Sequence, residues 1–340
     1  MNPLPRIGIT MGDPAGIGPE IAVKALEDPE LFGIVRPVVL GDPGALGLHL
    51  KPNSGAAVRE VNELKEAGLR PGAVDVLAVS HMDPDRYRPG RPTTEGGRSM
   101  VSAITRAVEL ALQGDLDAVV TGPISKVLMQ QAGYAFEGHT QLLAHLTGTE
   151  EVVMMLAGDR LRVTLVTIHC ALRDVPGLIS RDAVLRTLTM TDRGLRFDFG
   201  IETPRLAVAA LNPHAGEEGL FGDEEERIIA PAVEIARSRG IDAAGPFPAD
   251  TLFHKAASGS FEAVVCMYHD QGLIPLKLLH FSDGVNVTLG LPIVRTSVDH
   301  GTAYDIAGKG IADPSSLKAA IRTAALMAES RKARLQRPSK

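Results

Sequence analysis

The sequence predicts an α/β fold of mostly parallel sheets with helices on both faces. Short β-branched runs alternate with longer stretches whose apolar residues recur at helical spacing, and this alternation continues through both halves of the chain. Such alternation is typical of parallel sheets, in which each strand is joined to the next through a helix. The length of 340 residues corresponds to two domains or to one large one.

In the first half, an opening strand leads into a turn broken by glycine and proline, Gly12–Gly18, and Pro19 suits the first position of a helix. The stretch Asp83–Gly97, rich in proline and glycine, is expected to be a loop. The expected strands are Arg6–Met11, Pro37–Leu40, Val74–Val79 and Ala118–Val120, and the expected helices are Pro19–Leu26, Asn62–Ala67, Ser99–Leu112 and one from about Ser125.

The second half repeats the pattern without an internal sequence repeat. Its expected strands are Val152–Leu156, Val163–Ile168, Leu206–Leu211, Ala263–Tyr268 and Val285–Leu289, and its expected helices are Arg181–Thr189, Glu224–Arg239 and Ser315–Arg331.

Composition argues against several classes of protein. The chain has 35 Lys and Arg against 41 Asp and Glu, a formal net charge of −6, and no tryptophan, whereas nucleic-acid binders usually show a basic surface and stacking aromatic side chains. Two cysteines, Cys170 and Cys266, are too few for a disulfide framework or a four-thiolate metal site. Without a secretion signal or an apolar run of 18 residues, we expect a cytoplasmic protein with no nucleic-acid or membrane partner.

Three of the ten histidines share one structural position. His169, His214 and His269 each follow the carboxyl end of an expected strand, which is the edge where open α/β sheets bind ligands. Three imidazoles with a fourth position free are the ligand set of a catalytic zinc-type site, and such an ion lowers the pKa of a bound hydroxyl. The competing interpretation is that each histidine is simply a polar residue leaving a strand.

Basic residues near these histidines suggest an anionic substrate. Lys277 closely follows His269, and Arg295 follows a turn of glycine and proline, Gly290–Pro292; Arg binds carboxylate or phosphate in a bidentate manner and Lys supplies a point charge. Thr140, in the segment Gly-His-Thr, is placed to cap a helix whose amino terminus favours an anion. A plain tight turn explains that segment equally well.

The common nucleotide-binding motifs are missing. No Gly-x-Gly-x-x-Gly follows the first strand and no P-loop occurs, so a nicotinamide cofactor would need another mode of binding. The glycine-rich loop His300–Gly310 contains Asp305, a carboxylate able to accept hydrogen bonds from ribose hydroxyls.

Seven segments run in order from about Gly8 to Gly310: GITMGDPAGIGPE, VVTGPISK, GHTQLLA, NPHAGEEGLFGDEE, ADTLF, MYHDQGLIPLK and NVTLGLPIVRTSVDHGTAYDIAGKG. Together they resemble the 4-hydroxythreonine-4-phosphate dehydrogenase (PdxA) family. The loop HGTAYDIAGKGIADP is also similar to the adenosine-ribose loop of isopropylmalate and isocitrate dehydrogenases.

This resemblance implies the two-domain α/β/α fold of those dehydrogenases, an active-site cleft between the domains and a homodimer that shares the site. We expect residues 1–130 and 300–340 to form a discontinuous first domain. Residues 131–299 are expected to form the second, which carries the metal ligands and the dimer interface.

The resemblance also assigns roles by motif. The metal ligands, contributed by both subunits to a zinc, magnesium or cobalt ion, fall on His169, His214 and His269. The substrate contacts fall on His139, Thr140, Lys277, Asn286 and Arg295. Asp250, Lys277 and bulk water acting through the metal are the candidates for the general base, and the NAD or NADP cofactor is expected at His300, Gly301 and Asp305.

The implied activity is an NAD(P)-linked oxidation of 4-phosphooxy-L-threonine at C3. The product, 2-amino-3-oxo-4-phosphooxybutanoate, loses CO2 to give 3-amino-2-oxopropyl phosphate, a step in the biosynthesis of pyridoxal 5'-phosphate, a form of vitamin B6.

Three alternatives remain. A sister dehydrogenase would act on 4-phospho-D-threonate, 4-phospho-D-erythronate or a cyclic diol, and Gln141 is the residue of interest because many relatives carry Glu there. A phosphate acyltransferase would share a similar two-domain fold but would form no NADH. A non-catalytic phosphometabolite-binding protein would bind ligand without reducing NAD.

Overall fold

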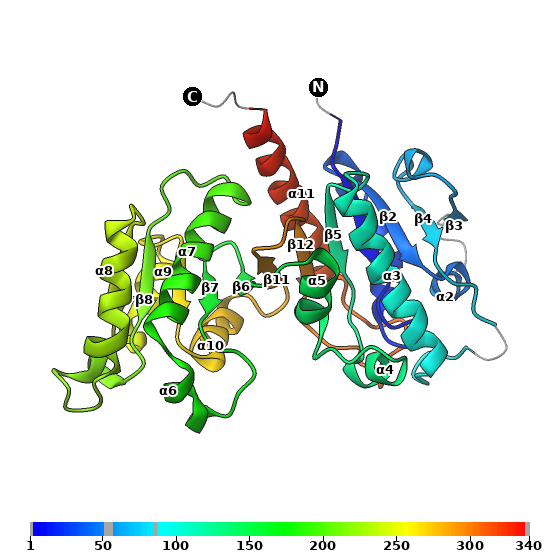
Figure 1. The fold of residues 1–340 in the computed structure, drawn as a ribbon. Coiled ribbons are helices and arrows are strands. Elements are labelled where there is room, and N and C mark those ends of the chain that lie inside the picture. The colour runs from blue at the N-terminus through cyan, green and yellow to red at the C-terminus, as the bar shows by residue number, and fades with distance from the viewer. Residues whose placement is uncertain (1–2, 51–56, 84–86, 337–340) are drawn as a thin grey trace. The chain divides into compact units, whose positions relative to one another are not determined.

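The computed structural model describes residues 3–50, 57–83 and 87–336, and Figure 1 shows their strands and helices. The α/β fold with mostly parallel strands is confirmed. The chain divides into two compact units: unit 1 is Met1–Glu151 with Leu291–Glu329, and unit 2 is Val152–Gly290 with Ser330–Lys340. Within the loop expected at Asp83–Gly97, residues 84–86 lie outside the described part.

Unit 1 contains a sheet in the order β3-β4-β2-β1-β5-β12, and each neighbouring pair is parallel. All residues of β5 and β12 are buried, as are all but the first of β1 and β2. Because successive side chains point to opposite faces of a strand, both faces of these strands must be covered. The strands are β1 (Arg6–Thr10), β2 (Arg36–Gly41), β3 (Ala57–Glu60), β4 (Ala73–Ala78), β5 (Ala118–Thr121) and β12 (Arg295–Val298).

Helices of unit 1 pack on this sheet and on one another. Helix α3 packs on β1, β2 and β5, and it begins where the Thr93 hydroxyl accepts a hydrogen bond from Gly96 N, 3.1 Å away. The helical elements are α1 (Gly18–Leu26), η1 (Leu31–Gly33), α2 (Pro43–Gly47), η2 (Leu64–Glu66), α3 (Thr94–Leu112), α4 (Lys126–Gln131), α5 (His139–Thr147) and α11 (Ser315–Leu335), which belongs to unit 1 as far as Glu329.

The strands of unit 2 lie in the order β11-β6-β7-β10-β8-β9. Strand β6 is antiparallel to both its neighbours, whereas β7, β10, β8 and β9 are parallel. The strands are β6 (Val153–Ala157), β7 (Arg162–Leu165), β8 (Leu206–Ala209), β9 (Ala243–Phe247), β10 (Ala263–Cys266) and β11 (Val285–Leu289).

Helices cover the sheet of unit 2 as well, with α7 packed on β6, β7, β10 and β11, and α10 packed on β7 and β10. The helical elements are η3 (Leu172–Asp174), α6 (Val175–Leu178), α7 (Arg181–Phe197), η4 (Pro213–Gly216), the π-helical turn η5 (Glu225–Ile229), α8 (Ala230–Ser238), α9 (Ala249–Ala257) and α10 (His269–Leu279).

Several elements differ from the expectation. The helix expected at Asn62–Ala67 is reduced to the short turn η2, because the chain must pass from β3 to its parallel neighbour β4 within a dozen residues. The strands β7, β8 and β10 end two or three residues before the apolar runs that predict them, since the backbone leaves the sheet there. Thr140 is not a helix cap: α5 begins at His139, after Gly138.

The unit boundaries also fall elsewhere than the sequence estimate of 1–130 with 300–340 and 131–299. Residues 131–151 and 291–299 belong to unit 1, because α5 packs on α3 and because β12 pairs with β5. His139, Thr140 and Arg295 therefore lie in unit 1 rather than with the strand-end histidines.

Within the described ranges, no helix combines the length and the apolar character needed to cross a membrane.

Gly12, in the turn after β1, should not tolerate a side chain. Its φ is +78°, and a Cβ there would lie 2.4 Å from Pro123 O. We expect Gly12→Ala to lower the free energy of unfolding by at least about 2 kcal/mol, measured by chemical denaturation. Gly72→Ala is the matched control, because its φ is +80° but no atom lies within 4 Å of the added Cβ, so only the backbone cost applies. Equal losses in the two variants would contradict the packing argument.

Candidate active site

Arg295 is a buried cation at the start of β12, and only 2% of its surface is exposed. Its Nε and an Nη atom donate to the Thr121 hydroxyl at the end of β5, at 3.2 and 2.8 Å. Burial lowers the pKa of Arg295 to about 9, so the guanidinium remains charged at neutral pH. A buried guanidinium is suited to bind a phosphate or carboxylate group, because desolvation strengthens the attraction.

His139, the first residue of α5, lies near this charge. Burial, and secondarily the charge of Arg295, hold the pKa of His139 well below its ordinary value, so the ring is neutral at pH 7. Its Nε2 atom is buried and has no hydrogen-bond partner among the described residues. Leaving such an atom unpaired costs roughly 1–3 kcal/mol, a cost that a ligand atom would remove.

The amino terminus of α5 adds to this anion-binding character. Thr140 is its second residue, and the first N–H groups of a helix favour a negative charge. Gln141 follows, and its side-chain amide donates to Glu137 at 3.2 Å. The structure thus brings His139, Thr140 and the Arg295 charge into one region of unit 1.

The expected cofactor residues lie on the loop after β12. His300 is half-buried and its Nε2 has no partner in the described part of the chain, while Nδ1 lies 3.1 Å from Gly301 O. Gly301 and Asp305 are exposed, and no atom lies within 4 Å of a Cβ built on Gly301. The loop therefore offers an unpaired ring nitrogen, an open backbone and a carboxylate to a ligand.

The parallel strands of unit 2 deliver the three histidines. His169 follows β7, His269 is the first residue of α10 after β10, and His214 lies in the turn after β8. The rings of His169 and His269 lie 5.8 Å apart between centroids. Two imidazoles on one tetrahedral zinc ion would have centroids about 5 Å apart, so the pair fits a divalent ion with little adjustment.

Asp270 orients one member of this pair. Its carboxylate lies 2.7 Å from His269 Nδ1. A carboxylate only accepts hydrogen bonds, so in the neutral ring Nδ1 carries the proton and Nε2 keeps its lone pair for a metal.

His214 lies on an unusual backbone. The φ angles of residues 214–219 are 53, 58, 83, 46, 57 and 89°, a left-handed turn that includes four non-glycine residues. Each non-glycine residue there costs roughly 1–2 kcal/mol, so neighbouring contacts must hold the turn. The His214 ring lies 6.4 Å from the Phe221 ring.

The buried carboxylate of Glu225 binds the two residues, Leu211 and Asn212, that lead into this turn. It accepts hydrogen bonds from Leu211 N at 2.8 Å, Asn212 N at 2.7 Å and the Asn212 amide at 2.9 Å. Sequence reasoning missed Glu225, although it lies in the acidic run Asp223–Glu226 that closely follows the NPHAG segment.

The structure brings two of the three histidines together. Among the residues that it describes, no three side chains of His, Cys, Asp or Glu converge closely enough to hold a metal ion. Of the other candidates in unit 2, Asp250 is exposed in the first turn of α9, Lys277 is half-buried on α10, and Asn286 is half-buried on β11.

These features define a mostly parallel α/β protein with an anion-binding region and an imidazole pair at strand ends. Comparison with known proteins agrees: the family model described as "Pyridoxal phosphate biosynthetic protein PdxA" matches residues 33–324. The chain belongs to this family.

Three relatives illustrate the similarity. A 4-hydroxythreonine-4-phosphate dehydrogenase from Desulfosudis oleivorans is 57% identical over 325 residues, covering 94% of this chain and 95% of that protein. A D-threonate 4-phosphate dehydrogenase from Cupriavidus necator is 46% identical and covers 96% and 98%. The crystal structure of a 4-hydroxythreonine-4-phosphate dehydrogenase from Klebsiella pneumoniae matches with a TM-score of 0.88 at 44% identity, covering 96% and 98%.

Ala215, inside the left-handed turn, tests the backbone strain. We expect Ala215→Gly to raise the free energy of unfolding by about 0.5–1 kcal/mol, because glycine adopts φ near +58° without steric cost. Thermal and chemical denaturation measure the change. The control is Ala111→Gly in α3, where the same substitution should destabilise by about 1 kcal/mol. A loss of stability in both variants would contradict the strained turn.

His139 predicts a dependence of stability on pH. Its folded-state pKa lies below that of the unfolded chain, so the unfolded state binds the proton more readily and stability falls as the pH drops below about 6.5. We expect the denaturant concentration at the unfolding midpoint to decrease as the pH is lowered from about 7 to about 5. The decrease should be smaller in His139→Gln. An unchanged pH dependence in that variant would remove His139 as a cause.

Proposed function

We propose that the chain is a metal-dependent NAD(P)-linked dehydrogenase that oxidises 4-phosphooxy-L-threonine at C3, yielding a β-keto acid that loses CO2 to form 3-amino-2-oxopropyl phosphate. The structural observation that carries the proposal is the His169–His269 pair at the carboxyl edge of parallel strands. The similarity of the chain to relatives of that name over nearly its whole length supports the same substrate.

We assign the metal to His169, His269 and His214. The donor set suits a divalent ion such as zinc, cobalt or magnesium, and nitrogen ligands favour the first two. When bound, the ion supplies Lewis-acid polarisation of the substrate hydroxyl and favours loss of its proton. Asp270 keeps the His269 ring in the orientation that leaves Nε2 available.

The substrate carries a phosphate and a carboxylate, and the chain offers matching groups. Arg295, the start of α5 at His139 and Thr140, and the half-buried Lys277 and Asn286 are the groups that we assign to these anions. His139, neutral at pH 7, supplies a hydrogen bond without adding charge. Asp250 and Lys277 are the candidates to accept the hydroxyl proton, and a nicotinamide cofactor, when bound, would supply the acceptor for the hydride from C3.

We assign the nicotinamide cofactor, NAD or NADP, to His300, Gly301 and Asp305. The unpaired Nε2 of His300 and the exposed carboxylate of Asp305 give a nucleotide one ring nitrogen and one acceptor for ribose hydroxyls. These groups share one loop, so a single segment would hold the adenosine half of the cofactor.

A homodimer that shares the site is part of the proposal. Ile274 and Leu278 on α10, and Phe281 just after the helix, are exposed at 60, 81 and 85% of their surfaces. Apolar side chains exposed this far are typical of a surface covered by a partner. Because α10 begins at His269, a second subunit on this face would lie on the helix that carries a metal ligand. We also propose a cytoplasmic location, consistent with the two free cysteines, Cys170 and Cys266.

A second candidate is the oxidation of 4-phospho-D-threonate, the substrate class that the Cupriavidus necator relative's name indicates. Such a substrate has a hydroxyl where the phosphorylated threonine has an ammonium group. Gln141, held by Glu137 beside His139 and Thr140, is the residue that we associate with the choice.

The test measures NADH or NADPH formation with each substrate, with and without a chelator, and measures zinc or cobalt content. We expect turnover of 4-phosphooxy-L-threonine that the chelator abolishes. His214→Ala should retain the folded circular dichroism spectrum and lose at least about a hundredfold in turnover and metal retention.

His145→Ala, at an exposed position of α5, is the control and should behave as the wild type. Faster turnover of 4-phospho-D-threonate would favour the second candidate. Wild-type turnover in His214→Ala with unchanged metal content would remove that residue from the site.

A further inference from the structure

The motif GDPAGIGPE after β1 has no role in the site described so far, yet it is bonded to the loop that carries the expected cofactor residues. Tyr304 OH donates to Asp13 Oδ2 at 2.5 Å, and Ile17 N donates to Thr302 O at 2.9 Å. Asp13 is fully buried. The two contacts hold the first part of the loop against the turn between β1 and α1.

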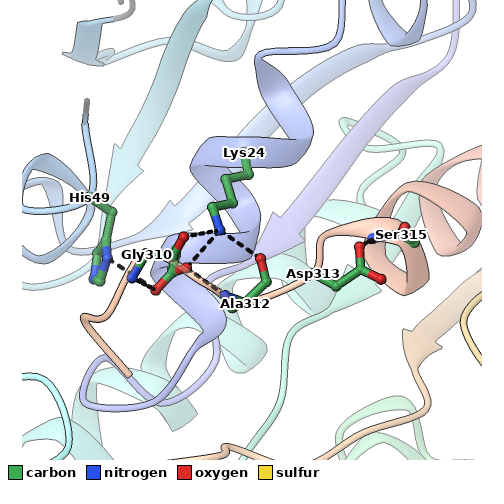
Figure 2. A network of polar contacts seen from close by, with 7 residues as sticks. Lys24, His49, Gly310, Ala312, Asp313 and Ser315 are labelled. Atoms are coloured by element: carbon green, nitrogen blue, oxygen red, sulfur yellow. Dashed lines mark hydrogen bonds and ion pairs between the residues drawn. The ribbon is translucent and has the colours of Figure 1, made fainter. Parts of the chain in front are cut away.

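A buried ion pair on α1 holds the far end of the same loop. Lys24 Nζ lies 2.8 Å from Glu20 Oε1, and their side chains are 16% and 2% exposed. Glu20 accepts hydrogen bonds from Ala312 N at 2.8 Å and from Gly310 N at 3.3 Å. Figure 2 shows Lys24 reaching the same segment, where its Nζ donates to Gly310 O at 2.9 Å and Ala312 O at 2.7 Å.

Glu20 and Lys24 bind the loop through its backbone atoms. The carboxylate of Glu20 accepts hydrogen bonds from the N–H groups of Gly310 and Ala312. The ammonium of Lys24 donates hydrogen bonds to the carbonyl oxygens of the same two residues. The side chain of Ile311 between them stays 65% exposed. The Glu20–Lys24 pair therefore fixes the path of the chain without using the side chains of the loop.

The carboxyl of Glu20 is ionised at neutral pH, because its pKa lies below the ordinary value. Burial opposes ionisation of Glu20, but the hydrogen bonds from Lys24 and Ala312 outweigh it and lower the pKa of the carboxyl. His49 Nδ1 lies 4.0 Å from Glu20 Oε2, and burial lowers the pKa of His49, so that ring is neutral at pH 7. Glu20 thus stays a carboxylate, and it accepts charge-assisted hydrogen bonds from Lys24 and from the backbone of the loop.

We propose that Glu20, together with Lys24, is a positioning residue for the nicotinamide cofactor, because the pair sets the geometry of the loop containing His300, Gly301 and Asp305 before the cofactor binds. This inference rests on the proposed assignment of the cofactor to that loop. A loop already ordered in the free enzyme loses less conformational entropy on binding, so the pair acts on cofactor affinity rather than on hydride transfer.

The test combines amide hydrogen exchange of the free protein with cofactor titration. In Glu20→Gln we expect exchange at Gly310 and Ala312 to accelerate about tenfold, because one charge-assisted interaction is lost. The dissociation constants of NAD and NADP, measured by calorimetry, and the KM for the preferred cofactor should rise by about the same factor, with kcat within about twofold.

Lys318→Met is the matched control. It breaks the ion pair of Lys318 with Asp28, which is 2.9 Å long and also joins α11 to the α1 region, but neither partner of this ion pair belongs to the loop. This variant should lose stability and keep the wild-type affinity for the cofactor. If Glu20→Gln yields too little folded protein, Tyr304→Phe removes the contact at the other end of the loop and should weaken cofactor binding in the same direction.

The outcomes separate the two proposals. If NADH protects residues 300–312 from exchange in the wild type but Glu20→Gln changes neither exchange nor affinity, the positioning role is wrong and the cofactor assignment stands. The positioning role is equally wrong if exchange accelerates in this variant while its affinity for the cofactor does not change. If NADH leaves the wild-type loop unprotected, the cofactor assignment fails and the positioning role fails with it.

Discussion

Parallel pairing of β-strands brings the carboxyl ends of distant chain segments to one edge of a sheet, and both units depend on this constraint. In unit 2 the edge gathers the segments after β7, β10 and β8, which carry His169, His269 and His214. In unit 1 it gathers the ends of β1, β5 and β12, so that Thr121 ends one strand while Asp13 and His300 follow its two neighbours. Each group comes from sequence positions more than 30 residues apart, and no local motif could assemble it.

Much of this arrangement can be predicted from the sequence, because buried parallel strands appear there as short apolar runs. Such runs predict β1, β5, β8 and β10, and the strand-end histidines are predicted from the polar residues that follow runs of this kind. The ends of the strands are predicted less accurately than their positions. A ladder of hydrogen bonds stops where the backbone turns away from the sheet, and this is not always where the apolar residues stop. At β7 the apolar run continues through Ile168, yet the strand ends at Leu165.

Other features had no sequence signal. Helix α10 contains Gly272 and Pro275, which normally indicate a loop, and packing on β7 and β10 overrides that preference. Glu225 holds the segment that leads into the left-handed turn at His214, and Glu20 holds the loop at Gly310 and Ala312, some 290 residues away along the chain. The sequence shows that Glu20 and Glu225 are carboxylates, but their hydrogen-bond partners are determined by the tertiary structure alone.

The discontinuous course of unit 1 has a consequence for biosynthesis. Strand β12 lies beside β5 but is separated from it in sequence by Val152–Gly290, the main segment of unit 2. During translation, the edge of β5 that pairs with β12 therefore keeps its backbone hydrogen-bonding groups unpaired with β12 until almost the entire polypeptide has left the ribosome. The strands of unit 2 all lie between Val153 and Leu289, so they leave the ribosome before β12 and can pair with one another before β5 meets β12.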